Sequence, residues 1–330
     1  MVASYMSGKT LDDVMRSIIE EIHSNGEYIN PTKGTCTELT GVLLEITNPR
    51  ARLSRTETRG KPFSCLGELC WYLAKTNELG FISYYIPDYC NYADGNLIFG
   101  GYGPRLFDWK GQNQVANITN LLRSKPSSRR AVIHLFDAGD IVEDHEDTPC
   151  TCTLQFIIRH DTLHMITYMR SNDVILGLPH DIFCFTMLQE IIARDLSVDV
   201  GIYKHVVGSL HLYDRDRDVA QQFLNEGWQS TEMPMPAMPL GDPWPAIQSL
   251  LDAEATIRNG NLPDAAKLKN LNEYWIDLIR LLQVFQYSKY NDIDNIEELS
   301  RSMSSPTYRP FIDKKLSECQ KRSRRQDFLS

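Results

Sequence analysis

The centre of the chain holds two β-rich runs followed by one long apolar helix, and this order constrains the fold more than any other feature. CTLQFIIR (152–159) and TLHMITYMR (162–170) are typical of strands, and His160-Asp161 between them is typical of a hairpin turn. The later stretch DIFCFTMLQEIIARDL places four apolar side chains on one helical stripe, namely Phe185, Leu188, Ile192 and Leu196. We therefore expect a β-sheet packed on a buried helix.

Further helices and strands are predicted on the N-terminal side of this centre. Residues 10–28 have the apolar spacing of an amphipathic helix, with Thr10 as the N-cap and Gly26 as the stop. Residues 66–75 read as a second helix, and 39–47 and 131–137 read as strands. The sequence shows no internal repeat.

The composition changes beyond residue 225. Five prolines lie between residues 234 and 245, which forbids a regular helix there and favours an extended segment. Helices are predicted near 246–258 and 264–287, and the basic end of the chain is expected to fray. We expect residues 1–225 to form the main domain, and residues 226–330 to form a proline-rich and helical extension packed on it.

Charge and hydropathy exclude several classes of protein. Among 330 residues, 43 are acidic and 34 are Lys or Arg, so the net charge of −9 argues against a protein that coats nucleic acid or an anionic membrane. No run reaches the roughly 20 apolar residues of a membrane span, and the N-terminus lacks the apolar core of a signal peptide. These patterns predict a cytoplasmic protein whose eight cysteines are reduced. Without a Cys-x-x-Cys pair, no metal site is predicted.

One group of residues has the chemistry of a covalent site for a phosphate monoester. Cys150 precedes a predicted strand, and a nucleophilic thiolate needs nearby cations. Arg129 and Arg130 lie upstream, and Arg170 lies downstream beside Ser171. Arginine forks and a serine hydroxyl are suited to phosphate. From chemistry alone, a packing cysteine and a solvated arginine pair remain the better interpretation.

The order of the motifs adds a resemblance. SSRRAVI, TPCTCTLQF, MRSNDVILGLP and HLY resemble, in this order, the signatures of the thymidylate synthase family, which includes the pyrimidine nucleotide hydroxymethylases. The similarity runs from about residue 40 to 225 and is free of gaps from Cys150 to Tyr213. It implies an α+β fold, a three-layer α/β sandwich with a large mixed sheet. It also implies 5,10-methylenetetrahydrofolate as the co-substrate.

The resemblance assigns roles around a pyrimidine nucleoside monophosphate. Cys150 would add to C6 of the base. Arg50, Arg170 and Ser171 would bind the phosphate, while Arg129 and Arg130 would reach into the partner's site of a homodimer.

Other matching positions concern the base, the sugar and the folate. Glu68 would move protons at the base, and its apolar neighbours would desolvate it; without the resemblance, a solvent-facing glutamate is the better interpretation. Tyr102 would face the nucleophile. His211 and Tyr213 would bind the sugar hydroxyls, and Asp173 would bind the pterin. Gly177 would allow close approach to the ligand.

A departure from the family pattern concerns the base. After LGLP, the uracil-using members have an aromatic residue and then an asparagine, whereas this chain has His180-Asp181. A carboxylate accepts from the cytosine N4 amine, but it would face O4 of uracil as acceptor against acceptor, at a cost of roughly 1–3 kcal/mol. The same change marks the cytidylate and deoxycytidylate hydroxymethylases of the family. An alternative role for Asp181 is to cap the helix that follows.

Other departures concern the fate of the one-carbon unit. Thr151 replaces a usual histidine, the short C-terminal closing tail is not identifiable, and no tryptophan is found in YIPDYCNYADG. A less sealed site favours addition of water over hydride transfer. We therefore predict a CMP or dCMP 5-hydroxymethylase, with ribose and deoxyribose both open.

Two alternatives are a thymidylate synthase acting on dUMP and a catalytically silent nucleotide-binding protein. A zinc deaminase is disfavoured because Pro149-Cys150-Thr151-Cys152 has the wrong spacing.

Overall fold

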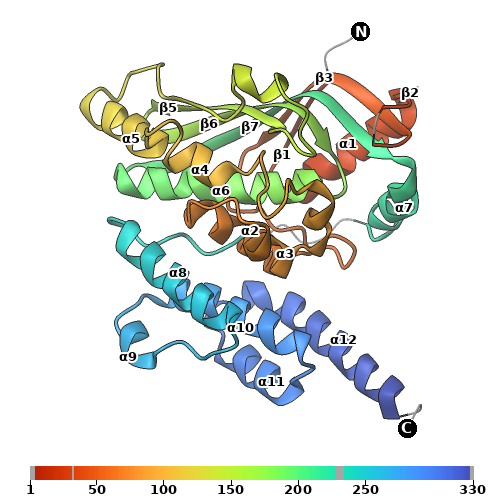
Figure 1. The fold of residues 1–330 in the computed structure, drawn as a ribbon, viewed down its shortest axis with the longest axis vertical. Coiled ribbons are helices and arrows are strands. Elements are labelled where there is room, and N and C mark those ends of the chain that lie inside the picture. The colour runs from red at the N-terminus through yellow and green to blue at the C-terminus, as the bar shows by residue number, and fades with distance from the viewer. Residues whose placement is uncertain (1–3, 32, 228–233, 328–330) are drawn as a thin grey trace.

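The computed structural model describes residues 4–31, 33–227 and 234–327, and within these ranges seven strands form one mixed sheet (Figure 1). The strands are β1 (Tyr5–Gly8), β2 (Glu27–Ile29), β3 (Cys36–Ile46), β4 (Val132–His134), β5 (Thr151–Arg159), β6 (Thr162–Asp173) and β7 (Asp199–Tyr213). Their order is β1-β3-β7-β6-β5-β4. β2 pairs with the first residues of β3, on the same edge where β1 pairs with its last residues. The expected mixed sheet is confirmed.

The predicted hairpin joins β5 and β6. Arg159 pairs with Thr162, and His160 and Asp161 between them have φ angles of 49° and 57°. Two consecutive positive φ angles are what a two-residue type I′ turn requires. The next pair, β6 and β7, is parallel, and Asp173 lies opposite His211. Both strands therefore end at the same edge of the sheet.

The helices before the extension are α1 (Leu11–Asn25), α2 (Pro62–Leu73), α3 (Leu79–Tyr85), α4 (Tyr102–Phe107), α5 (Gln114–Ser124), α6 (Gly177–Asp195) and α7 (Arg217–Asn225). Helix α6 lies along β6 and β7, and its residues 181–194 are all buried. This confirms the buried central helix. Helix α1 begins at the predicted Thr10 cap, whose side chain accepts from the Asp13 N–H, and ends before Gly26.

The C-terminal part adds α8 (Trp244–Arg258), α9 (Ala265–Leu268), α10 (Glu273–Lys289), α11 (Ile293–Ser302) and α12 (Arg309–Asp327). The prediction for 246–258 is confirmed, but the one for 264–287 is partly wrong, because a break before the Asn272 cap separates α9 from α10. The fraying expected of the final residues, KRSRRQDFLS (321–330), is wrong for residues 321–327, which continue α12, and residues 328–330 lie outside the described part of the chain. Phe311, Ile312 and Cys319 of α12 are buried, so packing maintains this basic helix.

The layers follow one another from the sheet outward (Figure 1). Helix α6 covers the sheet, α2 packs on α6, and α8 and α10 pack on α2. Tyr85 of α3 donates to Glu254 of α8 at 2.8 Å, and Tyr84 bonds to Gln286 of α10. In the described ranges, none of the helices is both long and apolar enough to cross a bilayer.

Candidate active site

A cavity of about 800 Å³ opens where the carboxyl ends of β6 and β7 meet the first turns of α6. Ligand sites in sheet proteins commonly form at such an edge. The cavity brings together ten of the thirteen residues proposed from the sequence. These are Glu68, Tyr102, Cys150, Arg170, Ser171, Asp173, Gly177, Asp181, His211 and Tyr213.

Cys150 lies on the loop that leads into β5, and Arg170 of β6 fixes this loop. The Arg170 Nε donates to the Pro149 carbonyl at 3.0 Å, and its Nη2 donates to the carbonyl and hydroxyl oxygens of Thr148, each at 3.0 Å. Burial raises the pKa of the Cys150 thiol to about 11, and the positive charge of Arg170 opposes this rise. The free protein therefore presents a protonated thiol at neutral pH.

This raised pKa predicts a steep pH dependence of Cys150 alkylation. Because the thiolate is the nucleophile and its fraction grows tenfold per pH unit below the pKa, the rate with iodoacetamide should rise about 100-fold from pH 7 to pH 9. The measurement is pulsed alkylation of the ligand-free protein with mass spectrometry of the Cys150 peptide. A rate that levels off below pH 8 would show an activated thiolate and contradict the expectation.

Tyr102 lies beside the nucleophile through Thr151. The Tyr102 hydroxyl oxygen accepts from the Thr151 N–H at 3.1 Å and from the Thr151 hydroxyl at 2.9 Å. Its own proton is then left to donate toward another acceptor. The residue that departs from the family pattern therefore anchors the predicted tyrosine.

Glu68 is buried at 5% exposure, so the solvent-facing alternative is wrong. Its Oε1 accepts from the Tyr72 hydroxyl at 2.7 Å, one helical turn along α2, and from the Tyr89 hydroxyl at 3.0 Å. Tyr89 lies in the 3₁₀ helix Pro87–Tyr92, which lines another side of the cavity. Two phenols thus hold one carboxylate oxygen, and the other remains for a ligand or a proton.

Asp181 is 9% exposed and accepts from Asn172 Nδ2 at 2.8 Å through its Oδ2. Helix α6 begins at Gly177 after Leu176, so Asp181 lies past the first turn, and the proposed capping role is wrong. Burial, together with the nearby Glu68 carboxylate, raises the pKa of Asp181 well above its usual value, and the Asn172 hydrogen bond opposes this rise.

Asp173 and His211 face each other across the parallel strands. Asp173 Oδ1 accepts from the backbone N–H groups of Ile175 and Leu176, at 2.7 and 3.2 Å, which turns the chain into α6. Burial raises the pKa of Asp173, and His211 opposes this rise. Gly177 follows this turn, and a Cβ there would lie 2.9 Å from Asn172 Nδ2. The glycine therefore leaves room for the amide that contacts Asp181.

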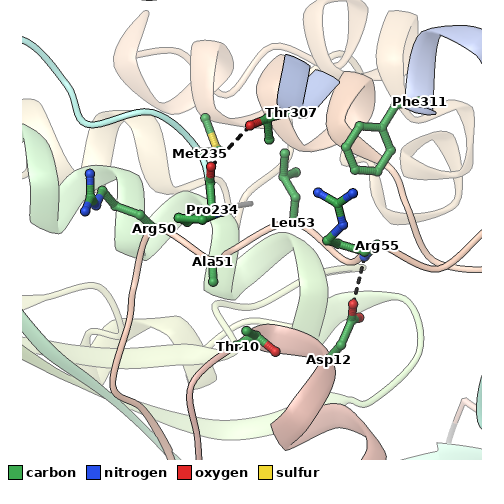
Figure 2. A pocket seen from close by; sticks show the side chains of 10 residues that line it. All are labelled: Thr10, Asp12, Arg50, Ala51, Leu53, Arg55, Pro234, Met235, Thr307 and Phe311. Carbon is green, nitrogen blue, oxygen red and sulfur yellow. Dashed lines mark hydrogen bonds between the residues drawn. The ribbon is translucent and has the colours of Figure 1, made fainter. Parts of the chain in front are cut away.

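The structure does not bring the other three arginines into this cavity. Arg50 lies beside a separate small cavity lined by residues such as Asp12, Arg55 and Phe311, and its guanidinium points away from them (Figure 2). Its backbone carbonyl accepts from the Met235 N–H at 2.9 Å, which ties it to the proline-rich segment. Arg129 and Arg130 are exposed between α5 and β4. Arg50 is thus not among the residues around the cavity that holds Cys150.

Sequence reasoning missed two cations of the cavity, Lys33 and Arg215. The Lys33 ammonium lies 4.3 Å from the centre of the Tyr92 ring, and the Arg215 guanidinium lies 4.4 Å from that of Tyr213. Lys33 reaches the cavity from the loop before β3, and Arg215 lies two residues past the end of β7. The position of Arg215 two residues after HLY was an available signal, whereas Lys33 had none.

A missed acid, Asp147, lies three residues before the nucleophile and lines the same cavity. Among the described residues, its carboxylate has no hydrogen-bonding or ion-pair partner, although Asp147 packs against Gly100, where a Cβ would lie 2.4 Å from Oδ2. Burial raises the pKa of Asp147, and Lys33 and Arg170 oppose the rise. It is therefore available to a ligand or a water molecule.

The fold and this cavity define an α+β protein with a cysteine, an arginine and buried acids at the carboxyl edge of a mixed sheet. Comparison with known families identifies it: the thymidylate synthase family model matches residues 13–255, and the chain belongs to that family. The match ends within α8, so α9 to α12 lie outside it.

Two relatives show the range of the family. A deoxyuridylate hydroxymethyltransferase of Bacillus phage SP01 is 28% identical over 216 residues, covering 61% of this chain and 55% of the relative. A thymidylate synthase of Listeria innocua serovar 6a is 28% identical over 170 residues, covering 50% of this chain and 52% of the relative. The chain therefore spans about half the length of these relatives.

Proposed function

We propose that the protein is a pyrimidine nucleotide 5-hydroxymethyltransferase that converts CMP or dCMP with methylenetetrahydrofolate and water. The observation that carries the proposal is the presence of a thiol, Cys150, and a buried acid, Asp181, in one cavity at the carboxyl ends of β6 and β7. Membership in the family supports covalent C5 chemistry.

In the proposed reaction, Cys150 is the nucleophile and Glu68 transfers protons. Cys150 loses its proton and its sulfur forms a bond to C6, which makes C5 nucleophilic. Glu68, held by two phenols, takes the C5 proton or passes protons at the base. At the end, the C6–S bond breaks and Cys150 leaves as a thiolate. Methylenetetrahydrofolate would supply the carbon at the formaldehyde level and depart as tetrahydrofolate.

The cavity suits both ligands. Its volume of about 800 Å³ lies in the upper range of small-molecule sites. Tyr89 and Tyr92 offer ring surfaces to a flat pterin in the same cavity as Asp173. For the nucleotide phosphate, we propose Arg170 and Ser171 as the sequence predicted, with Lys33 and Arg215 in place of Arg50. His211 and Tyr213 remain the proposed sugar contacts.

Asp181 favours cytosine as the base. The carboxyl group brings an acceptor for the N4 amine, and a proton retained by its raised pKa can pass to N3. Deoxyuridylate is the second candidate, because one relative is a deoxyuridylate hydroxymethyltransferase. A protonated Asp181 would donate to O4 of uracil. The proton therefore lies on the base, at N3, when the substrate is a cytosine nucleotide, and on Asp181 when it is a uracil nucleotide.

The experiment is a substrate panel of CMP, dCMP, UMP and dUMP, each tritiated at C5 and incubated with methylenetetrahydrofolate. Tritium release and a 5-hydroxymethyl product from the cytosine nucleotides are expected. Dihydrofolate formed with dUMP would instead identify a thymidylate synthase. Nucleotide binding without any tritium release would identify the silent binding protein.

Asp147 supports water as the final reactant. Its unpaired carboxylate would accept the proton of a water molecule whose oxygen attacks the exocyclic methylene at C5. Replacing Asp147 by Leu should lower the yield of 5-hydroxymethyl product about 100-fold while tritium release persists. Mass spectrometry with added 2-mercaptoethanol should then detect a 5-thioether. Equal loss of tritium release and product would contradict this role, and Asp147→Asn is the matched polar variant.

We also propose a homodimer. Val206 and Ile166 lie half-buried on the sheet face opposite α6, and Tyr168 beside them is 43% exposed. Such an apolar face favours a second copy. Arg129 borders it, because its carbonyl accepts from Gln155 Nε2 of β5 at 3.0 Å. This placement fits arginines that serve the partner's site rather than their own.

Mixed dimers test the shared arginines. One chain carries Cys150→Ser and the other carries Arg129→Ala with Arg130→Ala, each with its own affinity tag. If the arginines cross the interface, the isolated heterodimer has one complete site and about half of wild-type activity, although both parent homodimers are inactive. An inactive heterodimer would place the arginines in their own chain's site, and a monomer in sedimentation would end the proposal.

We further propose that residues 226–330 support the catalytic part, residues 1–225. The bonds from Tyr84 and Tyr85 to α10 and α8 hold α3, which leads directly into the cavity wall at Pro87–Tyr92.

A further inference from the structure

Three buried polar side chains continue from Asp181 into the core. Asn172 of β6 contacts Asp181, His205 of β7 contacts Asn172 with 3.1 Å between Nε2 and Oδ1, and Tyr203 contacts His205 with 2.8 Å between Oη and Nδ1. His205 and Tyr203 are 0% exposed, and Asn172 is 5% exposed. None of the cavity chemistry described above uses Tyr203 or His205.

Tyr203, His205 and Asn172 form a row of hydrogen bonds that leads to Asp181, and in this row each side chain donates to the next one. Burial lowers the pKa of His205 to about 3, so the ring is neutral and carries one N–H. The Asn172 Oδ1 can only accept, so the N–H of His205 lies on Nε2. The bare Nδ1 then accepts the Tyr203 proton. The Asn172 amide is thereby oriented with its Nδ2 toward Asp181.

We propose that Tyr203, His205 and Asn172 are positioning residues that hold Asp181 Oδ2 as a hydrogen-bond acceptor and so set the preference for a base with an exocyclic amine. The proposal rests on the proposed function, because it explains how that function selects its base. With Oδ2 committed to accepting, the carboxyl group cannot turn a hydroxyl toward Asn172. Gly177 protects the arrangement, since a side chain there would press on the Asn172 amide.

Removing the His205 side chain leaves the Asn172 amide free to rotate. Without the His205 donor, the Asn172 oxygen can rotate toward Asp181, and this favours a protonated Asp181. The one proton of that acid is then donated to Asn172 and cannot pass to N3 of cytosine, so the base meets a neutral carbonyl oxygen, which is a weaker acceptor for the N4 amine than a carboxylate. The cytosine preference should therefore fall even though no residue in contact with the base has changed.

The test compares kcat/KM for dCMP and dUMP in His205→Phe and Tyr203→Phe. The expected result is a ratio lowered at least 10-fold in His205→Phe and less in Tyr203→Phe, with partial rescue by His205→Gln, whose amide can donate to Asn172. The control is Gln189→Met on α6. Gln189 is equally buried and bonds to the Leu163 carbonyl at 2.8 Å, outside the row, so only stability should change.

Several outcomes would overturn the inference without affecting the proposed function. One is a His205→Phe protein that loses both activities equally and keeps the wild-type ratio. Another is a nitrogen-15 spectrum of the wild-type protein that shows the proton of His205 on Nδ1. A wild-type protein that releases no tritium from any nucleotide would instead overturn the proposed function, and the nitrogen-15 measurement still decides the direction of the row.

Discussion

Replacing Asp181 by Asn should reverse the order of the substrates. The Asn172 Nδ2–H that now bonds to Asp181 Oδ2 would select the amide oxygen of the new side chain. The second lone pair of that oxygen would accept from N3–H of uracil, and the amide nitrogen would donate to O4. Cytosine would meet an NH₂ group opposite its own amine. We therefore expect turnover of dCMP or CMP to fall about 100-fold or more and turnover of dUMP to rise, since each unpaired polar group costs about 1–3 kcal/mol.

The measurement is tritium release from C5 across the four-nucleotide panel. Thermal melting checks that the variant folds, and alkylation of Cys150 checks that the nucleophile is unchanged. An Asp181→Asn protein with the wild-type order of substrates would show that the residue does not read the base.

The central elements were predictable because their signals are local. The hairpin follows from two β-rich runs and a two-residue turn that takes positive φ angles, and α6 follows from an apolar run in which every residue from 181 to 194 is buried. The gap-free stretch from Cys150 to Tyr213 contains β5, β6, α6 and β7, so the residues expected there meet at one sheet edge.

Other residues were not predictable because their positions depend on the assembled sheet and loops. Arg50 follows β3 along the chain, but the loop after β3 carries it to the proline-rich segment. Lys33 precedes β3, whose first residue, Cys36, pairs with Tyr213 of β7 at the cavity. The row behind Asp181 depends on the register of β6 and β7, in which Thr167 lies opposite His205. No spacing in the sequence shows that register.

Replacing Cys150 by Ser should abolish C5 chemistry with every nucleotide. A buried serine hydroxyl has a far higher pKa than the thiol, which itself reaches about 11, so attack on C6 becomes negligible. The phosphate and base contacts that we propose belong to other side chains of the cavity, including Arg170 and Asp181, and they remain in place. We therefore expect tritium release to fall at least about 10,000-fold while nucleotide binding changes by less than about threefold.

Cys152 provides the matched control for this experiment. It lies two residues further along, is half-buried, and is not among the side chains around the cavity. Cys152→Ser should keep wild-type tritium release, and isothermal titration calorimetry with the nucleotide should give similar affinities for both variants. If Cys150→Ser retained tritium release, no covalent bond at C6 would be needed. The cysteine would then be a packing residue, and the role of Asp181 would have to be judged from binding alone.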